Sequence, residues 1–343
     1  MEIYQSGRSS TMTNNSTTLY EYYYDFDDVE HSCDDPMDFS TISAAFFIVI
    51  FIISITGNSL LLFVLVRRGN LKNATNLFIL NLTCSNLVFA VNLPFWAVEL
   101  LHHWVFGDLG CKLLSAADFV GFYSSVILLT AVTVDHFITV VLNKWPSKLV
   151  RVRCAAGFCA TAWIISIVAS LHIAIKMKET TNEDGELICG TDDPDAKLIY
   201  LLQMSLLFFL PLVIIIFCYC AILKTVLQFS NRKKNRTVVM VLCIVAAFFI
   251  CWGPYTMFSL FLTFHVPDNC YVWESWHIAS NICLILALSH CCVNPLFYML
   301  SQNMRRHLLH FLHCDNVRNM ERATSSSDVT SQASLVMVDL ESK

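Results

Sequence analysis

Charged residues and glycine are scarce in this sequence of 343 residues. Only 14% of the residues are Asp, Glu, Lys or Arg, against roughly 25% in typical globular domains, whereas 56% are hydrophobic. A water-soluble protein of this size has too little interior to hide so much apolar surface, and disordered chains and coiled coils are far more polar. The composition therefore indicates that a lipid bilayer is the solvent for most of the chain.

Sequence patterns of common enzymes are missing as well. The chain contains no Gly-x-Ser-x-Gly, His-Glu-x-x-His or phosphate-loop motif, and its ten glycines leave few for a loop that wraps a nucleotide. We therefore expect no enzyme, no cofactor and no nucleic-acid partner. Transport is the weaker alternative, because transporters usually carry an internal repeat and none relates the two halves of this chain.

Seven apolar segments are each long enough to cross a bilayer as a helix, which takes about 20 residues. Lipid offers no hydrogen bonds to the backbone, so a bundle of helices is the form that fits. We therefore expect an all-α membrane protein with a seven-transmembrane bundle over 40–301. The expected spans are 41–66, 75–101, 109–141, 152–175, 197–224, 237–264 and 274–300.

The uneven distribution of charge predicts the orientation. Residues 1–39 form an acidic, Tyr-rich tail of net charge −8, and 17 of the 22 Lys and Arg residues fall on the other side of the expected membrane. The positive-inside rule then places the N-terminus outside and the C-terminus in the cytosol of a multi-pass plasma-membrane protein. No basic segment followed by an apolar run precedes the tail, so we expect the first span to direct targeting.

The cytosolic side continues past the last span. We expect a short amphipathic juxtamembrane helix over 302–313 and a Ser/Thr-rich tail over 314–343. The basic residues before the sixth span are expected to meet anionic lipid or a protein partner. They are Arg232, Lys233, Lys234 and Arg236.

Most of the fifteen cysteines lie in spans, where a thiol behaves as a small apolar group. Four face the oxidising side, and this even number predicts two disulfides in one of three pairings. These four are Cys33, Cys111, Cys189 and Cys270. Cys291 and Cys292 beside His290 are poor metal ligands, because adjacent helical residues point about 100° apart, and we expect no metal site.

Three kinds of modification are predicted outside the spans. Asn14 and Asn15 lie in overlapping glycosylation sequons on the outer side. Cys314 is a candidate for palmitoylation, with an idle juxtamembrane thiol as the alternative. Phosphorylation of the tail would recruit arrestin through added charge, whereas a merely disordered tail would not. The candidate residues are Thr324, Ser325, Ser326 and Ser327.

An ordered set of motifs resembles the rhodopsin-like G-protein-coupled receptors. The set comprises Gly57-Asn58, Asn81-Leu82, Trp163, Pro211, Tyr219, Cys251-Trp252-Gly253-Pro254 and Asn294-Pro295-Leu296-Phe297-Tyr298. Three further segments resemble the chemokine-receptor branch, namely Leu93–Glu99, Trp104–Gly107 and Ser289–Cys292. Lys234-Asn235-Arg236-Thr237 and Trp252-Gly253-Pro254-Tyr255 are similar to the XC type within that branch.

The resemblance implies a chemokine as ligand and a heterotrimeric G protein as partner, with chemotaxis and a calcium response as output. It also implies disulfides between Cys111 and Cys189 and between Cys33 and Cys270. A dimer of the receptor is a further candidate assembly.

Chemokines, as the resemblance implies, are small basic proteins that the acidic tail would steer and capture. The tail residues expected to bind are Tyr20, Tyr22, Tyr23, Tyr24, Asp25, Asp27 and Asp28, and the alternative is a solvated tail without a partner. The pocket residues expected to bind are Trp96, Glu99, Asp118, Tyr123 and Tyr255.

Asp118 is the central pocket residue in this hypothesis. It lies two helical turns past Cys111, where its carboxylate would receive a cationic group of the ligand. An acid here also resembles the carboxylate of aminergic receptors, so a small amine is the competing ligand class. Glu99 is the second acidic contact, with a plain rim residue as its alternative.

Breaks in the helices are expected to act as pivots between two packings of the bundle. The residues assigned to activation and coupling are Asn86, Asp135, His136, Phe137, Pro211, Tyr219, Trp252, Pro254, Asn294, Pro295 and Tyr298.

Three departures from the family pattern weaken the expectation of G-protein signalling. The family's Asp-Arg-Tyr is here Asp135-His136-Phe137, its buried aspartate in span two is Asn86, and its usual glutamate in span seven is Leu284. A scavenging receptor that binds chemokine with little G-protein coupling is therefore the main alternative.

Overall fold

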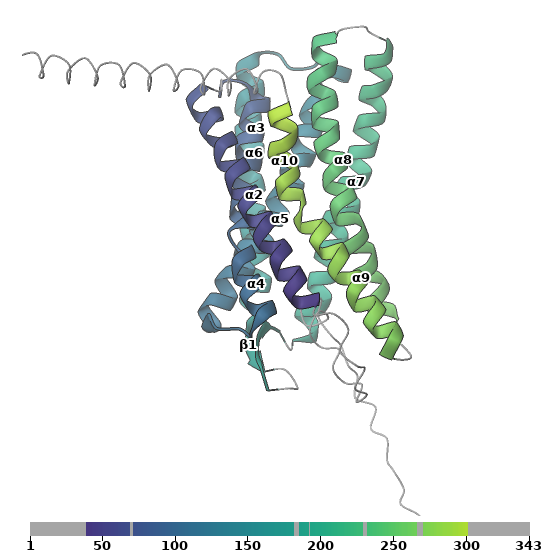
Figure 1. The fold of residues 1–343 in the computed structure, drawn as a ribbon. Coiled ribbons are helices and arrows are strands. Elements are labelled where there is room, and N and C mark those ends of the chain that lie inside the picture. Colours follow the sequence, from purple (N-terminus) through teal and green to yellow (C-terminus); the bar gives the residue numbers. More distant parts are fainter. Residues whose placement is uncertain are drawn as a thin grey trace, which may run out of the picture.

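The computed structural model describes residues 39–68, 71–181, 185–191, 193–228, 232–265 and 270–300. Within these residues, seven helical spans are long and apolar enough to cross a membrane. They stand side by side in one bundle (Figure 1). The predicted fold class, an all-α membrane protein with seven spans, is confirmed.

The elements follow in the order α2 (Phe39–Arg68), α3 (Ala74–Ala90), α4 (Leu93–Leu101), α5 (Gly107–Phe137), the π-helix η1 (Ile138–Leu142), α6 (Lys148–Ala174), β1 (Lys178–Thr181), β2 (Leu187–Gly190), α7 (Pro194–Gln228), α8 (Arg232–Phe264), α9 (Cys270–Leu288) and α10 (His290–Leu300). Two of the predicted spans are divided. Span two consists of α3 and α4, and span seven consists of α9 and α10.

Proline explains the division of span two. Pro94 has no backbone N–H to continue the helix, and it lies in the first turn of α4, where none is needed. In span seven, Pro295 lies inside α10 and leaves the carbonyl of Cys291 without its helical donor. The side-chain amide of Asn58 on α2 donates to that carbonyl over 2.9 Å, so a neighbouring helix replaces the missing hydrogen bond.

The connection between α6 and α7 contains a β-hairpin. Its strands pair antiparallel, with Glu179 opposite Cys189. We call the end of the bundle that carries the hairpin the hairpin end, and the end where α5 runs into η1 the opposite end. The hairpin end is the lower end in Figure 1.

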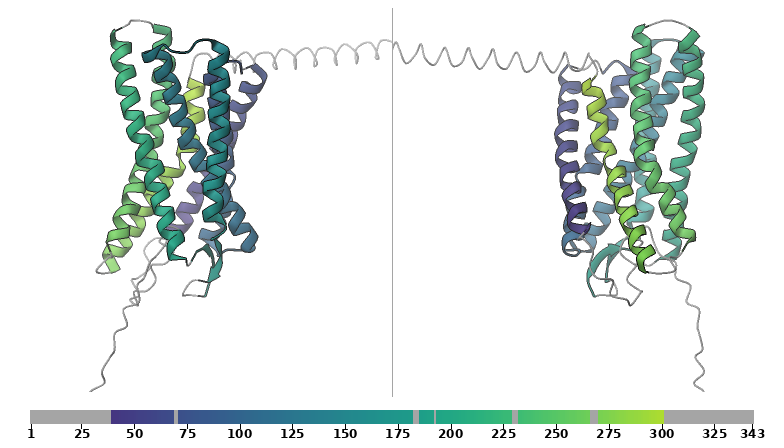
Figure 2. Two further views of the ribbon diagram at one scale, coloured as in Figure 1. Left: turned by 180° about the vertical axis from the view of Figure 1, so that it is seen from behind. Right: turned by 45° about the vertical axis from the view of Figure 1, so that its right-hand side comes forward.

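Helix α5 is the central element of the bundle. It contacts α3, α6, α7, α8 and both strands of the hairpin, and Figure 2 shows the bundle of these helices from two further directions. Gly121 permits α5 to approach α3 closely, because a Cβ atom on Gly121 would lie 2.9 Å from the backbone nitrogen of Phe89 on α3. Outward-facing positions such as Ile164, Val168 and Phe217 expose large apolar side chains, as lipid-facing positions require.

Replacing Gly121 with alanine is expected to lower stability. The added methyl group would force α3 and α5 apart, and overpacking of this kind costs about 1–3 kcal/mol. The measurement is the thermal unfolding midpoint of the receptor in detergent. Gly157→Ala is the matched control, because no atom lies within 4 Å of its Cβ position. Equal midpoints for the two variants would contradict the prediction.

Candidate ligand and coupling sites

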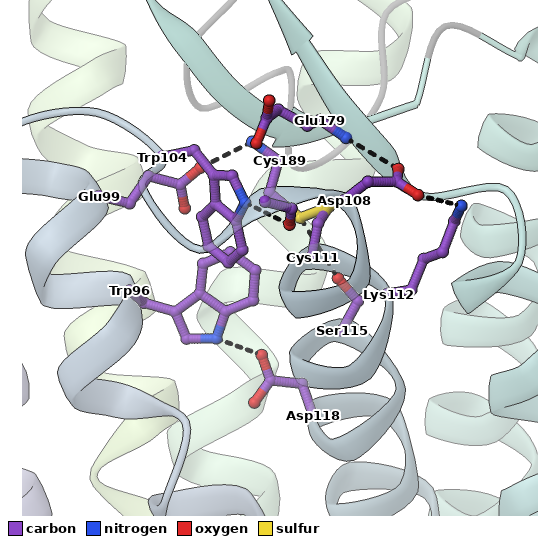
Figure 3. The surroundings of a disulfide bond; sticks show 11 residues. Trp96, Glu99, Trp104, Asp108, Cys111, Lys112, Ser115, Asp118, Glu179 and Cys189 are labelled. Carbon is purple, nitrogen blue, oxygen red and sulfur yellow. Dashed lines mark hydrogen bonds and ion pairs between the residues drawn. A yellow bond between two sulfur atoms is a disulfide. The ribbon is translucent and has the colours of Figure 1, made fainter.

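Cys189 on the hairpin is joined to the bundle by both a covalent bond and a hydrogen bond. Cys111 near the start of α5 forms a disulfide with Cys189 on β2, with the Cα atoms 5.4 Å apart. Glu99 on α4 accepts a hydrogen bond of 2.9 Å from the backbone nitrogen of Cys189, and only 4% of Glu99 is exposed. Figure 3 shows both contacts at the same point of β2. Glu99 therefore lies beneath the hairpin instead of on an open rim.

Trp104, in the connection between α4 and α5, adds a second attachment. Its backbone nitrogen donates to the carbonyl of Leu187 over 2.6 Å, and its indole nitrogen donates to the carbonyl of Gly107 over 2.9 Å. The side chain is fully buried, and its ring centroid lies 5.6 Å from that of Trp96. The two tryptophans thus form a continuous layer between α4 and β2 (Figure 3).

Asp118 lies below this layer and uses both of its carboxylate oxygens within the protein. The amide of Asn92 donates to Oδ1 over 2.7 Å, and the indole nitrogen of Trp96 donates to Oδ2. The residue is 7% exposed. Contact between Asp118 and a ligand cation, expected from the sequence, remains a prediction, and the structure places two protein donors where such a cation would bind.

Tyr123 lies further along α5 from the hairpin, and Tyr255 lies on α8. Tyr123 is fully buried, and its hydroxyl donates to Gln203 on α7 over 2.9 Å. The ring of Tyr255 lies 6.1 Å from that of Trp252 on the same helix. Tyr255 also lines a cavity of about 10 Å³ with Met204 on α7, which has room for about one water molecule.

An aromatic cluster occupies the middle of the bundle. Trp252 packs against Phe122 on α5 at a ring distance of 4.3 Å and against His290 on α10 at 5.5 Å. The side-chain nitrogens Trp252 Nε1 and His290 Nε2 are buried and have no hydrogen-bond partner among the described residues. The cluster joins three spans through ring contacts, so a shift of one helix changes the packing of the other two.

Asn86 belongs to a neutral polar network beside this cluster. Its amide donates to Asn58 over 3.3 Å, and its carbonyl accepts from Ser125 over 3.4 Å. Each amide thus has a neutral partner on another helix. The network links α2, α3 and α5 without a charged group, as the replacement of the family's aspartate by Asn86 predicts.

At the opposite end, Asp135 is paired with a residue that sequence reasoning missed. Arg151 on α6 donates from Nε and Nη2 to the two carboxylate oxygens, over 2.9 and 2.5 Å. The Asp135 side chain is 3% exposed and the Arg151 side chain 22%. A guanidinium from α6 therefore neutralises the motif acid.

The neighbours of Asp135 are also buried. His136 is 5% exposed, and its Nε2 atom has no partner among the described residues. The hydroxyl of Tyr219 on α7 is also buried and has no hydrogen-bond partner among the described residues. The Phe137 ring lies 5.9 Å from that of Phe217, which brings the ends of α5 and α7 together. Pro211 and Pro254 lie inside α7 and α8.

The structure therefore brings Trp96, Glu99 and Asp118 together under the hairpin, with Tyr123 further along α5 and Tyr255 on α8. Sequence reasoning missed the partners Asn92, Gln203 and Arg151. Asn92 offered a signal, because it directly precedes the Leu93–Glu99 segment. Arg151 lies 16 residues beyond Asp135 across a turn, and spacing of this kind carries no sequence signal.

Several predicted residues lie outside the described residues. They are Asn14, Asn15, Tyr20, Tyr22, Tyr23, Tyr24, Asp25, Asp27, Asp28, Cys33, Cys314, Thr324, Ser325, Ser326 and Ser327. Only the backbone is described for Cys270, Asn294 and Tyr298. The pairing of Cys33 with Cys270 thus stays a prediction.

Comparison with known proteins gives the family. A family model described as 7 transmembrane receptor (rhodopsin family) matches residues 57–298. The chain belongs to this receptor family. Human (Homo sapiens) Chemokine XC receptor 1 is 35% identical over 304 residues, which cover 87% of this chain and 88% of the relative. Human C-C chemokine receptor type 8 is 31% identical over 305 residues, which cover 85% of each chain.

A viral protein shows the same similarity. G-protein coupled receptor E1 of Equine herpesvirus 2 (strain 86/87) is 30% identical over 314 residues, covering 85% of this chain and 81% of the relative. The receptor described here is accordingly a member of the chemokine-receptor group, a multi-pass protein of the plasma membrane and not an enzyme.

Removing one partner of the Asp135–Arg151 pair is expected to destabilise the receptor. Arg151→Gln leaves a buried carboxylate without its cation, a loss of about 3 kcal/mol. The double variant Asp135→Asn/Arg151→Gln removes both charges and is expected to recover most of this loss. Thermal unfolding in detergent measures both effects.

The exposed pair of Lys112 and Asp108 provides the control. Lys112 lies 2.5 Å from Asp108 at the surface, so Lys112→Gln is expected to leave the unfolding midpoint unchanged. A double variant as unstable as Arg151→Gln would contradict the assignment of a buried, mutually compensating pair.

Proposed function

We propose that this receptor binds a basic chemokine at the hairpin end and signals through a heterotrimeric G protein at the opposite end. The acidic tail over 1–39 captures the ligand, and the cluster under the hairpin receives the inserted part of it. The similarity to Chemokine XC receptor 1 over 87% of the chain carries this proposal, and it favours an XC-class chemokine as the ligand.

The charges of the described residues support the proposed orientation. At the hairpin end, acids outnumber lysines: Glu99, Asp108, Asp118, Glu179, Glu186 and Asp193 stand against Lys112, Lys176 and Lys178. Near the opposite end the charges are Arg67, Lys72, Lys144, Lys148, Arg151, Arg153 and Lys224, with the acid Asp135. The hairpin end therefore suits a basic ligand outside the cell, and the opposite end suits the cytosolic face.

The route between the two ends passes through the aromatic cluster. Tyr255 and Trp252 lie on α8, which Pro254 interrupts, and Trp252 touches α5 through Phe122. A ligand that shifts Tyr255 would change the packing of Trp252 and favour a second arrangement of α7 and α8 at the opposite end. Calcium release and chemotaxis are the expected cellular outputs, with arrestin binding to the phosphorylated tail.

Chemokine scavenging is the second candidate function. Two observations favour it: His136 stands in place of the motif arginine, and Asp135 is already paired with Arg151. A buried neutral histidine offers a G protein no fixed charge. A receptor of this kind would internalise chemokine without activating G proteins.

A small-amine receptor is the third candidate and rests on Asp118 alone. An ammonium group would share the carboxylate with two protein donors, Asn92 and Trp96. Saturable binding of a primary amine such as tyramine would support this candidate over the chemokine proposal.

Neutralising the acids of the tail is expected to slow capture of the chemokine. Asp25→Asn/Asp27→Asn/Asp28→Asn removes three negative charges beside the tyrosines, and loss of steering is expected to lower the association rate about tenfold at low salt. Surface plasmon resonance on receptor in nanodiscs measures this rate. Asp34→Asn/Asp35→Asn/Asp38→Asn is the charge-matched control, and an equal loss in both variants would show that net charge alone matters.

Introducing the missing arginine is expected to separate signalling from scavenging. We expect His136→Arg to raise chemokine-stimulated nucleotide exchange on the G protein about fivefold or more and to leave internalisation unchanged. Phe137→Tyr is the control, because it alters the same motif without adding a cation. If wild type and His136→Arg both internalise chemokine without nucleotide exchange, scavenging replaces the signalling proposal.

A further inference from the structure

Asp118 occupies the point where the kink of span two meets α5. Asn92 lies between the end of α3 and the start of α4, and its amide reaches Oδ1 of Asp118 over 2.7 Å. The same amide lies 3.3 Å from the carbonyl oxygen of Val88 on its own chain segment. The carboxylate therefore ties the kinked part of span two to α5.

The second oxygen of Asp118 holds Trp96 one turn further along α4. Because Trp96 donates to Oδ2, the position of the carboxylate fixes the direction of the indole ring. The ring is 7% exposed and lies against Trp104. Figure 3 shows Asp118, Trp96 and Trp104 stacked in this order toward the hairpin.

Trp104 connects the Trp96 ring to the hairpin. Its backbone nitrogen binds the carbonyl of Leu187 at the start of β2 over 2.6 Å. Two residues later, Cys189 is held by Glu99 and by the disulfide to Cys111. The strand is thus attached at both of these positions, and one attachment depends on the tryptophan layer above Asp118.

We propose that Asp118 is a positioning residue for ligand recognition, which orients Trp96 and, through Trp104, fixes the hairpin that borders the ligand site. The identity of the ligand in this inference rests on the proposed function. The positioning of Trp96 and of the hairpin by Asp118 does not. In this inference Asp118 affects ligand binding by holding the hairpin. Direct contact between Asp118 and a ligand cation would be the simpler interpretation of the sequence.

The cost of freeing the carboxylate favours the indirect role. A ligand cation that draws Asp118 away from its partners breaks its hydrogen bonds with the buried N–H groups of Asn92 and Trp96, and the loss of such hydrogen bonds costs free energy. Chemokine binding that leaves these two hydrogen bonds in place avoids this loss. Asp118 would then act on affinity by holding the hairpin in a conformation that accepts the ligand.

Hydrogen–deuterium exchange of the ligand-free receptor in nanodiscs tests the structural content. The variants are Asp118→Asn, which keeps the shape but replaces one acceptor with a donor, and Trp96→Phe, which keeps an aromatic ring but removes the N–H group. Both are expected to speed exchange of the Trp104 amide and the amides of 187–190 about fivefold or more. Gly157→Ala on α6, whose Cβ position has no atom within 4 Å, is the control and is expected to change nothing.

Equilibrium binding of a recombinant XC-class chemokine tests the consequence for recognition. Each variant is expected to weaken affinity about tenfold, and the double variant no further than either single one, because both act on the same Trp96–Asp118 hydrogen bond, which Asp118→Asn deprives of the acceptor charge and Trp96→Phe removes. A loss for Asp118→Asn with full affinity for Trp96→Phe would indicate a direct ligand contact and overturn the inference. Strictly additive losses would overturn it as well.

The two experiments separate the inference from the function on which it rests. Unchanged hairpin exchange in Asp118→Asn and Trp96→Phe overturns the inference, even if the wild type binds chemokine. A wild type that binds no chemokine overturns the proposed function, and exchange at 187–190 still decides whether Asp118 positions the hairpin.

Discussion

The absence of water in the bilayer core governs this structure. A helix that crosses lipid satisfies its own backbone, but each break in a helix and each polar side chain needs a partner from a neighbouring helix. The Cys291 carbonyl, which has no helical donor because residue 295 is proline, accepts a hydrogen bond from Asn58. Asn86 forms hydrogen bonds with Asn58 and Ser125, and the buried acid Asp135 forms an ion pair with Arg151. The helices are held in register by these contacts as well as by apolar packing.

The same requirement gives the two ends of the molecule different constructions. At the hairpin end, neutral donors surround Asp118 and the backbone of β2 binds Glu99, so the acids are held by directional hydrogen bonds. At the opposite end, an ion pair joins α5 to α6 directly. The first arrangement leaves the bordering hairpin sensitive to small shifts of span two, and the second holds the end of α5 next to η1 firmly against α6.

Sequence reasoning was sufficient for the fold because length, apolarity and charge asymmetry are local properties. Seven spans follow from them, and the motif around Trp252 and Pro254 indicates the receptor family. The contacts of single side chains were harder to predict. Whether Asp118 faces a ligand or Trp96 depends on how the kink at Pro94 turns α4, and the partner of Asp135 depends on where α6 begins. Both are set by packing between segments distant in the sequence.

The spacing of α2 and α10 depends on a side chain that is missing. The ring of Pro295 lies where a side chain at position 57 would be, because a Cβ atom on Gly57 would come within 2.9 Å of it. Any larger residue at position 57 would push α10 away from α2 and lengthen the hydrogen bond from Asn58 to the Cys291 carbonyl. The glycine and the asparagine that follows it thus act together, since the first brings the two helices close enough for the second to reach across.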